Sequence, residues 1–132
     1  MPYFENGDTM LVRQWRHAWE VSSWEVPAGT FDGDEDPLEC ARRELAEETG
    51  LIAARYTSLG VVHGAAFLAG SAYLFLAEGL TESTRSPESY EQDMEVLRIP
   101  FAEALNAALD GEIVHSGSVT ALSRAARALK LI

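Results

Sequence analysis

Three glutamates near the middle of the chain have the types and the spacing that metal chemistry requires. Glu44, Glu47 and Glu48 stand at i, i+3 and i+4, so a helix would place their carboxylates on one face within reach of one another. Gly50 is expected to end that helix, so Glu47 and Glu48 lie in the last turn, where the helix dipole disfavours a negative charge by about 0.3 to 1 kcal/mol. A solvated face with Arg43 paired to Glu47 is one interpretation. A divalent cation explains the cluster better, because it removes both the repulsion and the dipole cost.

The distribution of charge supports a cation site. The chain has 132 residues with 21 acidic and 10 basic side chains, a formal net charge of -11. Residues 29–51 hold eight of the acids and two arginines, so more than half of the net charge lies in this segment. Proteins that bind nucleic acid or anionic membranes need basic surfaces. We therefore expect neither partner.

The elements that position these glutamates can be read from local signals. The length and a mean hydropathy of -0.07 indicate one globular domain, residues 1–132. Asp36 and Pro37 form a strong helix start, and Leu38, Ala41 and Leu45 give that helix an apolar stripe. The expected helices are residues 37–49, 101–110 and 119–131, and the expected strands are residues 9–15, 23–26, 56–62, 71–77 and 95–99. Central strands with one early helix and two late ones predict an α/β fold, a mixed sheet between helical layers.

Other features are less specific. The last helix is expected to be capped by Ser116 or Ser118. The single cysteine, Cys40, excludes an intramolecular disulfide and is interpreted as a packing residue. Residues 1–5 lack the basic and apolar blocks of a signal peptide, so we expect a cytoplasmic protein. The histidines have no metal-ligand spacing and are interpreted as structural or solvent-facing: His17, His63 and His115.

The segment at residues 24–51 resembles the signature of a known enzyme family. Gly29, Glu35 and the run Arg43-Glu44-Leu45-Ala46-Glu47-Glu48-Thr49-Gly50-Leu51 match every fixed position of the Nudix box, G-x5-E-x7-R-E-U-x-E-E-x-G-U. The phrase Trp24-Glu25-Val26-Pro27-Ala28-Gly29 resembles the ADP-ribose and nucleotide-sugar pyrophosphatase branch. The resemblance implies a Nudix-type α/β/α sandwich with a central mixed β-sheet.

The resemblance also implies a reaction and its ligands. Members of the family hydrolyse a nucleoside diphosphate linked to another moiety, with a divalent metal, and release a nucleoside monophosphate and a phosphorylated product. Mg2+ is the expected cofactor, and Mn2+ is possible. The metal ligands would be Glu44, Glu47, Glu48 and the backbone carbonyl of Ala28, and Arg43 would orient the carboxylates.

The remaining site residues are assigned less directly. Arg16 and Arg13 would contact the substrate phosphate, although either is equally a solvated charge at a strand end. Gly64, in the loop after the third strand, would also contact substrate. The general base would be a glutamate of the loop at residues 81–92, with Glu91 preferred to Glu88, and each of these is equally a solvated loop acid. Tryptophans could stack on a base or belong to the core: Trp15, Trp19 and Trp24.

The substrate is the most open point. ADP-ribose hydrolases usually have a proline about fifteen residues past the box, but none occurs here between Pro37 and Pro87, and the loop at residues 63–70 is apolar. A nucleoside-triphosphate-cleaving Nudix enzyme and a non-catalytic nucleotide-sensing module therefore stay as alternatives. The resemblance implies a homodimer. Many relatives carry an additional N-terminal sheet that swaps between subunits, and because only residues 1–8 precede the first expected strand, contacts of that kind are not expected from these residues.

Overall fold

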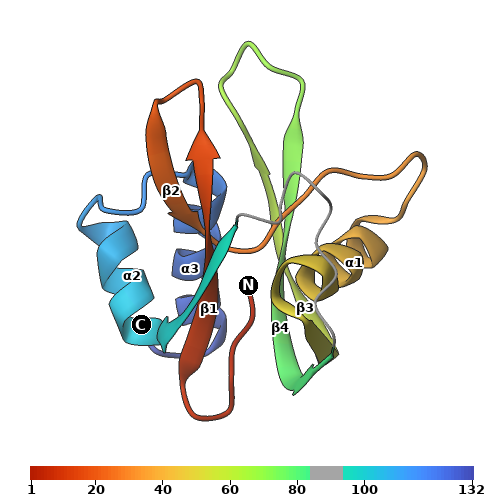
Figure 1. Cartoon of the computed structure of the whole chain (residues 1–132), viewed down its shortest axis with the longest axis vertical. Helices are drawn as coiled ribbons and strands as arrows, with labels where there is room; N and C mark the ends of the chain where they lie inside the picture. The colour runs from red at the N-terminus through yellow and green to blue at the C-terminus, as the bar shows by residue number, and fades with distance from the viewer. Residues whose placement is uncertain (84–93) are drawn as a thin grey trace.

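The chain forms two antiparallel sheets flanked by helices, shown in Figure 1. The structure is a computed structural model and describes residues 1–83 and 94–132. Its elements follow in chain order: β1 (Asp8–Arg16), β2 (Val21–Glu25), α1 (Pro37–Thr49), β3 (Leu51–His63), β4 (Ser71–Glu82), β5 (Glu95–Pro100), α2 (Phe101–Leu109) and α3 (Ser116–Ala128). No helix within these ranges is long and apolar enough to span a bilayer.

The two sheets meet through the start of the chain. One sheet has the order β2-β1-β5 and the other is the β3-β4 hairpin, with every ladder antiparallel. Residues 2 and 3 bridge them, because Pro2 pairs in parallel with Ala77 of β4, while Tyr3 pairs antiparallel with Thr9 of β1. This isolated bridge at Pro2 is parallel, whereas the strand ladders are antiparallel.

The packing on β4 creates the layered sandwich. Leu74 and Leu76 belong to a large core formed with α2 and α3. Ala77 packs instead with Leu45 of α1 and with Leu51. Helices therefore cover the β3-β4 hairpin from opposite sides, and the expected α/β/α architecture is confirmed (Figure 1).

Helix α1 has the ends that its sequence predicts. The Leu38 N–H donates to the Asp36 side chain at 3.0 Å, and Pro37 stands at the first helical position. Gly50 ends the helix with φ of 73°, a left-handed conformation that favours glycine. The apolar stripe is narrower than expected, because Leu45 is buried while Leu38 and Ala41 are only half-buried.

Several boundaries differ from the sequence-based expectation: β4 extends to Glu82 and not to residue 77, and α3 spans Ser116–Ala128 and not residues 119–131. Strand β3 begins at Leu51, directly after the helix cap, and not at residue 56. Helix α3 is capped by His115, whose side chain accepts from the Ser118 N–H, so the expected serine cap is wrong. The Ser118 side chain is fully buried and has another role, described below.

Candidate active site

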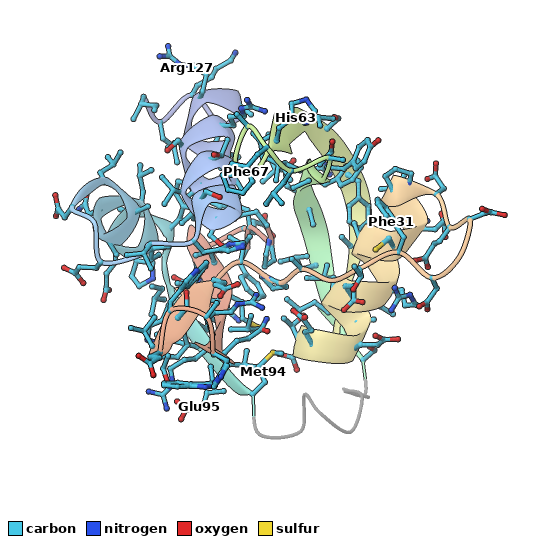
Figure 2. All side chains as sticks on the ribbon, turned by 90° about the horizontal axis from the view of Figure 1, so that it is seen from above. Phe31, His63, Phe67, Met94, Glu95 and Arg127 are labelled. Atoms are coloured by element: carbon cyan, nitrogen blue, oxygen red, sulfur yellow. The ribbon has the colours of Figure 1, made fainter. Side chains whose placement is uncertain are left out.

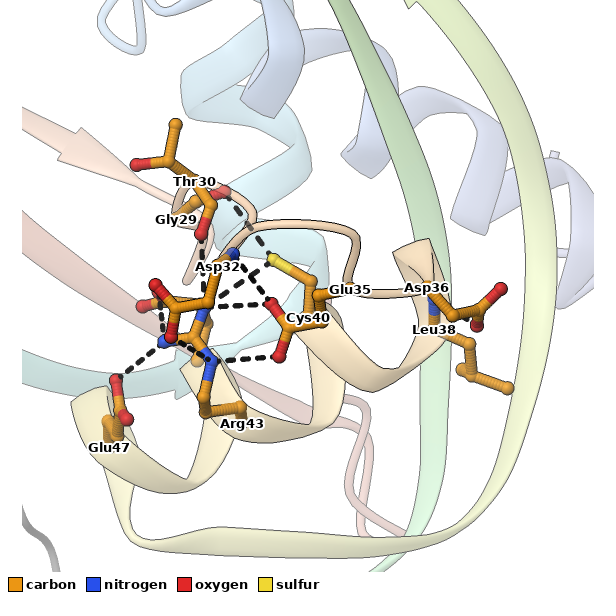
Figure 3. A network of polar contacts seen from close by, with 10 residues as sticks. Gly29, Thr30, Asp32, Glu35, Asp36, Leu38, Cys40, Arg43 and Glu47 are labelled. Atoms are coloured by element: carbon orange, nitrogen blue, oxygen red, sulfur yellow. Dashed lines mark hydrogen bonds and ion pairs between the residues drawn. The ribbon is translucent and has the colours of Figure 1, made fainter.

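The guanidinium of Arg43 organises the acidic face of α1, as Figure 3 shows. Its Nη1 donates to Glu44 at 2.8 Å and to Glu47 at 3.1 Å. Its Nε donates to Glu35 at 3.0 Å, and its Nη2 donates to the Thr30 carbonyl at 3.0 Å. The hydrogen bonds from Arg43 are the main cause that lowers the pKa of Glu35 to about 2, and the same contacts raise the pKa of Arg43. One guanidinium therefore forms ion pairs with four acidic residues of this segment: Asp32, Glu35, Glu44 and Glu47.

Two glutamates of α1 are buried beneath the loop that precedes the helix. Glu44 is 5% exposed and Glu48 is fully buried. The Ala28 N–H donates to Glu48 Oε2 at 3.1 Å. A Cβ placed on Gly29 would lie 2.0 Å from Glu44 Cδ, so only glycine allows this close approach. The structure thus brings together Glu44, Glu48 and the Ala28–Gly29 backbone.

A third buried carboxylate, Glu25 at the end of β2, lies near this cluster. Glu25 is 1% exposed and binds Arg16 through two hydrogen bonds, from Nε at 2.7 Å and from Nη2 at 2.5 Å. The hydrogen bond from Glu25 is the main cause that raises the pKa of Arg16, and the charge of Glu48 adds to it. Arg16 is therefore held by Glu25 and lies within electrostatic reach of Glu48.

Ser118 ties the end of β2 to the start of α3. Its Oγ accepts from the Val26 N–H at 2.9 Å and lies 2.8 Å from His115 Nδ1. Because the Ser118 N–H also donates to His115 Nδ1 at 3.2 Å, that ring nitrogen is an acceptor, and burial lowers the pKa of His115. These bonds fix Val26, two residues before Ala28, and support the structural interpretation of His115.

Comparison with known proteins identifies the family. The family model described as NUDIX domain matches residues 3–118. The chain belongs to the NUDIX family. It is 41% identical over 116 residues to ADP-ribose pyrophosphatase of Mycobacterium tuberculosis, covering 85% of this chain and 56% of that protein. It is 32% identical over 138 residues to GDP-mannose pyrophosphatase of Cronobacter sakazakii, covering 89% and 66%.

A solved structure supports the Nudix fold. The crystal structure described as ADP compounds hydrolase superposes with a TM-score of 0.85 at 23% identity, covering 98% of this chain and 71% of that chain. At this identity the likeness shows the fold alone. The chain spans about 56 to 66% of the length of the two curated relatives above. Nudix hydrolases generally use divalent metals, which agrees with the chemistry of the buried carboxylates.

The structure does not bring all of the expected Nudix site residues together. Arg13 pairs with Glu95 and lies 5.6 Å from the centre of the Trp24 ring. Gly64 lies in the loop joining β3 to β4, which projects at the top of Figure 1. Glu88 and Glu91 lie outside the described residues. Within the described ranges no three His, Cys, Asp or Glu side chains already form a group that could hold an ion.

Sequence reasoning missed Glu25 and Ser118 as site residues. The available signal for Glu25 was an acid in a short strand that forms a hairpin with an arginine-bearing strand, and β1 does pair with β2 in this way. No local pattern pointed to Ser118, because its partner Val26 is 92 residues away in the sequence.

Proposed function

We propose that this Nudix domain hydrolyses the pyrophosphate bond of a nucleoside diphosphate linked to another moiety, of the ADP-ribose or nucleotide-sugar type. The products would be a nucleoside monophosphate and a phosphorylated second moiety. The observation that carries the proposal is the burial of Glu44 and Glu48 against the Ala28–Gly29 backbone within a complete Nudix box. The names of the relatives, ADP-ribose pyrophosphatase and GDP-mannose pyrophosphatase, support this substrate class.

The donor set suits a hard divalent cation. Glu44, Glu47, Glu48 and the Ala28 carbonyl would hold it, and we propose Mg2+, with Mn2+ as the alternative. Buried carboxylates are costly unless they are paired or bind metal, and the close approach at Gly29 places backbone beside the Glu44 carboxylate. When bound, the cation supplies neutralising charge to the phosphoryl oxygens.

The arginines and glutamates of the chain would perform the other roles. Arg43 keeps the carboxylates of Glu44 and Glu47 aligned through its Nη1. Arg16 would bind a substrate phosphate, because Glu25 takes only its Nε and Nη2 edge and the arginine side chain stays 36% exposed. Substrate contact by Arg13 and Gly64 stays a prediction from the sequence.

The attacking water would be deprotonated by a loop glutamate. We keep Glu91 as the preferred general base and Glu88 as the second choice, on the sequence alone. A glutamate in this role must come within hydrogen-bond reach of the water when substrate is bound. The homodimer and the cytoplasmic location also stay predictions from the sequence.

The acidity of the chain has a functional consequence in this proposal. A protein with a net charge of -11 repels a diphosphate. A cation held by the acidic face of α1 would reverse that repulsion locally. We therefore expect substrate binding, and not only turnover, to depend on the divalent cation.

Replacing Glu48 by Gln tests the proposal. Glutamine has nearly the same shape and can still accept from the Ala28 N–H, so the fold should survive while a charged ligand is lost. Because metal catalysis supplies several kcal/mol, we expect kcat to fall by roughly 100-fold or more. Glu39→Gln on the same helix is the control, since Glu39 is 61% exposed and pairs only loosely with Arg42 at 3.8 Å. Unchanged turnover in folded Glu48→Gln would refute the site, and no turnover in the wild type would favour a sensing module.

A further inference from the structure

An apolar cavity of about 260 Å3 lies beside the buried glutamates. Ala28, Gly29 and Glu44 border it, so the cavity shares residues with the proposed cation site. The other lining residues come from β3, β4, α1, the start of α3 and the first residue of the chain. The side chains that matter most for its chemistry are Phe31, Cys40, Ala41, Tyr56 and Tyr73.

Two aromatic side chains from separate elements meet at the edge of this cavity. The rings of Phe31 and Tyr73 lie edge to face, with centroids 5.8 Å apart and an interplanar angle of 70°. Phe31 is 42% exposed and Tyr73 is 47% exposed, so the pair combines a large apolar area with access from solvent. Figure 2 shows Phe31 on the loop that leads into α1. Such a pair offers faces and edges on which a flat ring can stack.

The size of the cavity limits what it can hold. Sites for whole small molecules occupy about 300 to 1,000 Å3, so this cavity suits one moiety of a nucleotide and not the complete substrate. A phosphate would face the carboxylate of Glu44 and lose its hydration. A sugar would bring several hydroxyl groups into an apolar wall, where unsatisfied polar groups are disfavoured. The nucleobase is the one moiety of the proposed substrate that is both flat and uncharged.

We propose that this cavity binds the nucleobase of the substrate, with Phe31 and Tyr73 as the stacking residues. The inference rests on the proposed function, because it is the shared border at Ala28, Gly29 and Glu44 that connects the cavity to the diphosphate. Ser71 and Tyr56 also line the cavity and bring hydroxyl groups that can hydrogen-bond to the edge of a base.

Kinetics of Tyr73→Ala and Phe31→Ala test the stacking. Loss of one aromatic platform should raise KM by roughly 5- to 150-fold, with kcat changed much less, because neither residue is one of the proposed metal ligands. Phe67→Ala is the matched control, since Phe67 is 89% exposed on another loop and does not line the cavity (Figure 2). Equal KM values in all three variants and the wild type would overturn the proposal.

A second measurement uses the unaltered protein and needs no turnover. Cys40 lines the cavity, and burial is the main cause that raises the pKa of its thiol to about 11. Adenosine, guanosine, cytidine and uridine are each added while alkylation of Cys40 is followed at pH 9, without divalent cation. At least one nucleoside should slow alkylation several-fold, and ribose alone should not. Protection without any hydrolysis would support the cavity but defeat the proposed function. Hydrolysis by the wild type, with no protection of Cys40 and no change of KM in the Phe31 and Tyr73 variants, would refute nucleobase binding in this cavity and leave the proposed function standing.

Discussion

Removing the guanidinium of Arg43 should destabilise the fold more than any other single charge change on α1. Arg43 is 22% exposed and donates to Glu35, Glu44 and Glu47 and to the Thr30 carbonyl. In Arg43→Ala these carboxylates lose their shared cation. The mostly buried Glu44 then loses the hydrogen bond and the positive charge that Arg43 supplies.

The magnitude follows from the burial of the partners. Loss of one member of a buried ion pair costs about 3 to 5 kcal/mol. Because Arg43 is about one-fifth exposed, water can replace part of its contacts in the variant. We therefore expect Arg43→Ala to lower the free energy of unfolding by about 2 to 4 kcal/mol. Domains of this class have total stabilities of about 5 to 15 kcal/mol. At about 4 °C per kcal/mol, the midpoint of thermal unfolding should fall by roughly 8 to 16 °C.

Thermal unfolding followed by circular dichroism measures this effect. Arg42→Ala is the control, because Arg42 is 53% exposed, its contact to Glu39 is 3.8 Å long and its guanidinium lies 5.2 Å from the centre of the Tyr56 ring, so we expect a change of at most about 1 kcal/mol. Mg2+ should restore part of the stability of Arg43→Ala, since it would neutralise the same carboxylates. Equal midpoints for the two variants, with or without Mg2+, would refute the role given to Arg43.

Two further predictions concern the same segment. Gly29→Ala places a methyl group 2.0 Å from Glu44 Cδ, so Glu44 must move and turnover should fall at least about tenfold. Gly70→Ala is the control, because a Cβ at Gly70 meets open space and turnover should not change. Equal activities of the two variants would contradict the close approach at Gly29. Arg43 holds the pKa of Glu35 at about 2, so the stabilisation from Glu35 is complete above about pH 4.5 and is lost as the pH falls towards 2. The difference in urea midpoint between the wild type and Glu35→Gln should therefore shrink from pH 5 to pH 2, and a constant difference would count against this pair.

The parts of the fold that follow local rules could be predicted from the sequence. Asp36, Pro37 and Gly50 mark the ends of α1 through a side-chain cap, a preset φ and a left-handed φ. The i, i+3, i+4 spacing placed Glu44 and Glu48 on the same side of that helix, and both are buried there. These features depend on neighbours within a few turns, so no tertiary information was needed.

The parts that depend on distant contacts could not be predicted. Strand β3 begins at Leu51 because its backbone pairs with Glu82 of β4, a partner that local patterns do not reveal. His115 is a poor cap by residue type, but burial lowers the pKa of its ring and the Ser118 N–H donates to its Nδ1. The role of Glu25 likewise depends on Arg16 in the facing strand. Each miss is a case in which tertiary contacts decide what a side chain does.

The most direct test of the central claim is a product assay with and without Mg2+. The wild-type protein is incubated with ADP-ribose, other nucleotide sugars, dinucleotides and nucleoside triphosphates, and nucleoside monophosphate and pyrophosphate are followed. We predict nucleoside monophosphate from an ADP-ribose or nucleotide-sugar substrate when Mg2+ is present, and none when it is chelated. Release of pyrophosphate from triphosphates alone would favour the triphosphate-cleaving alternative. Absence of any metal-dependent product across the set would contradict the account.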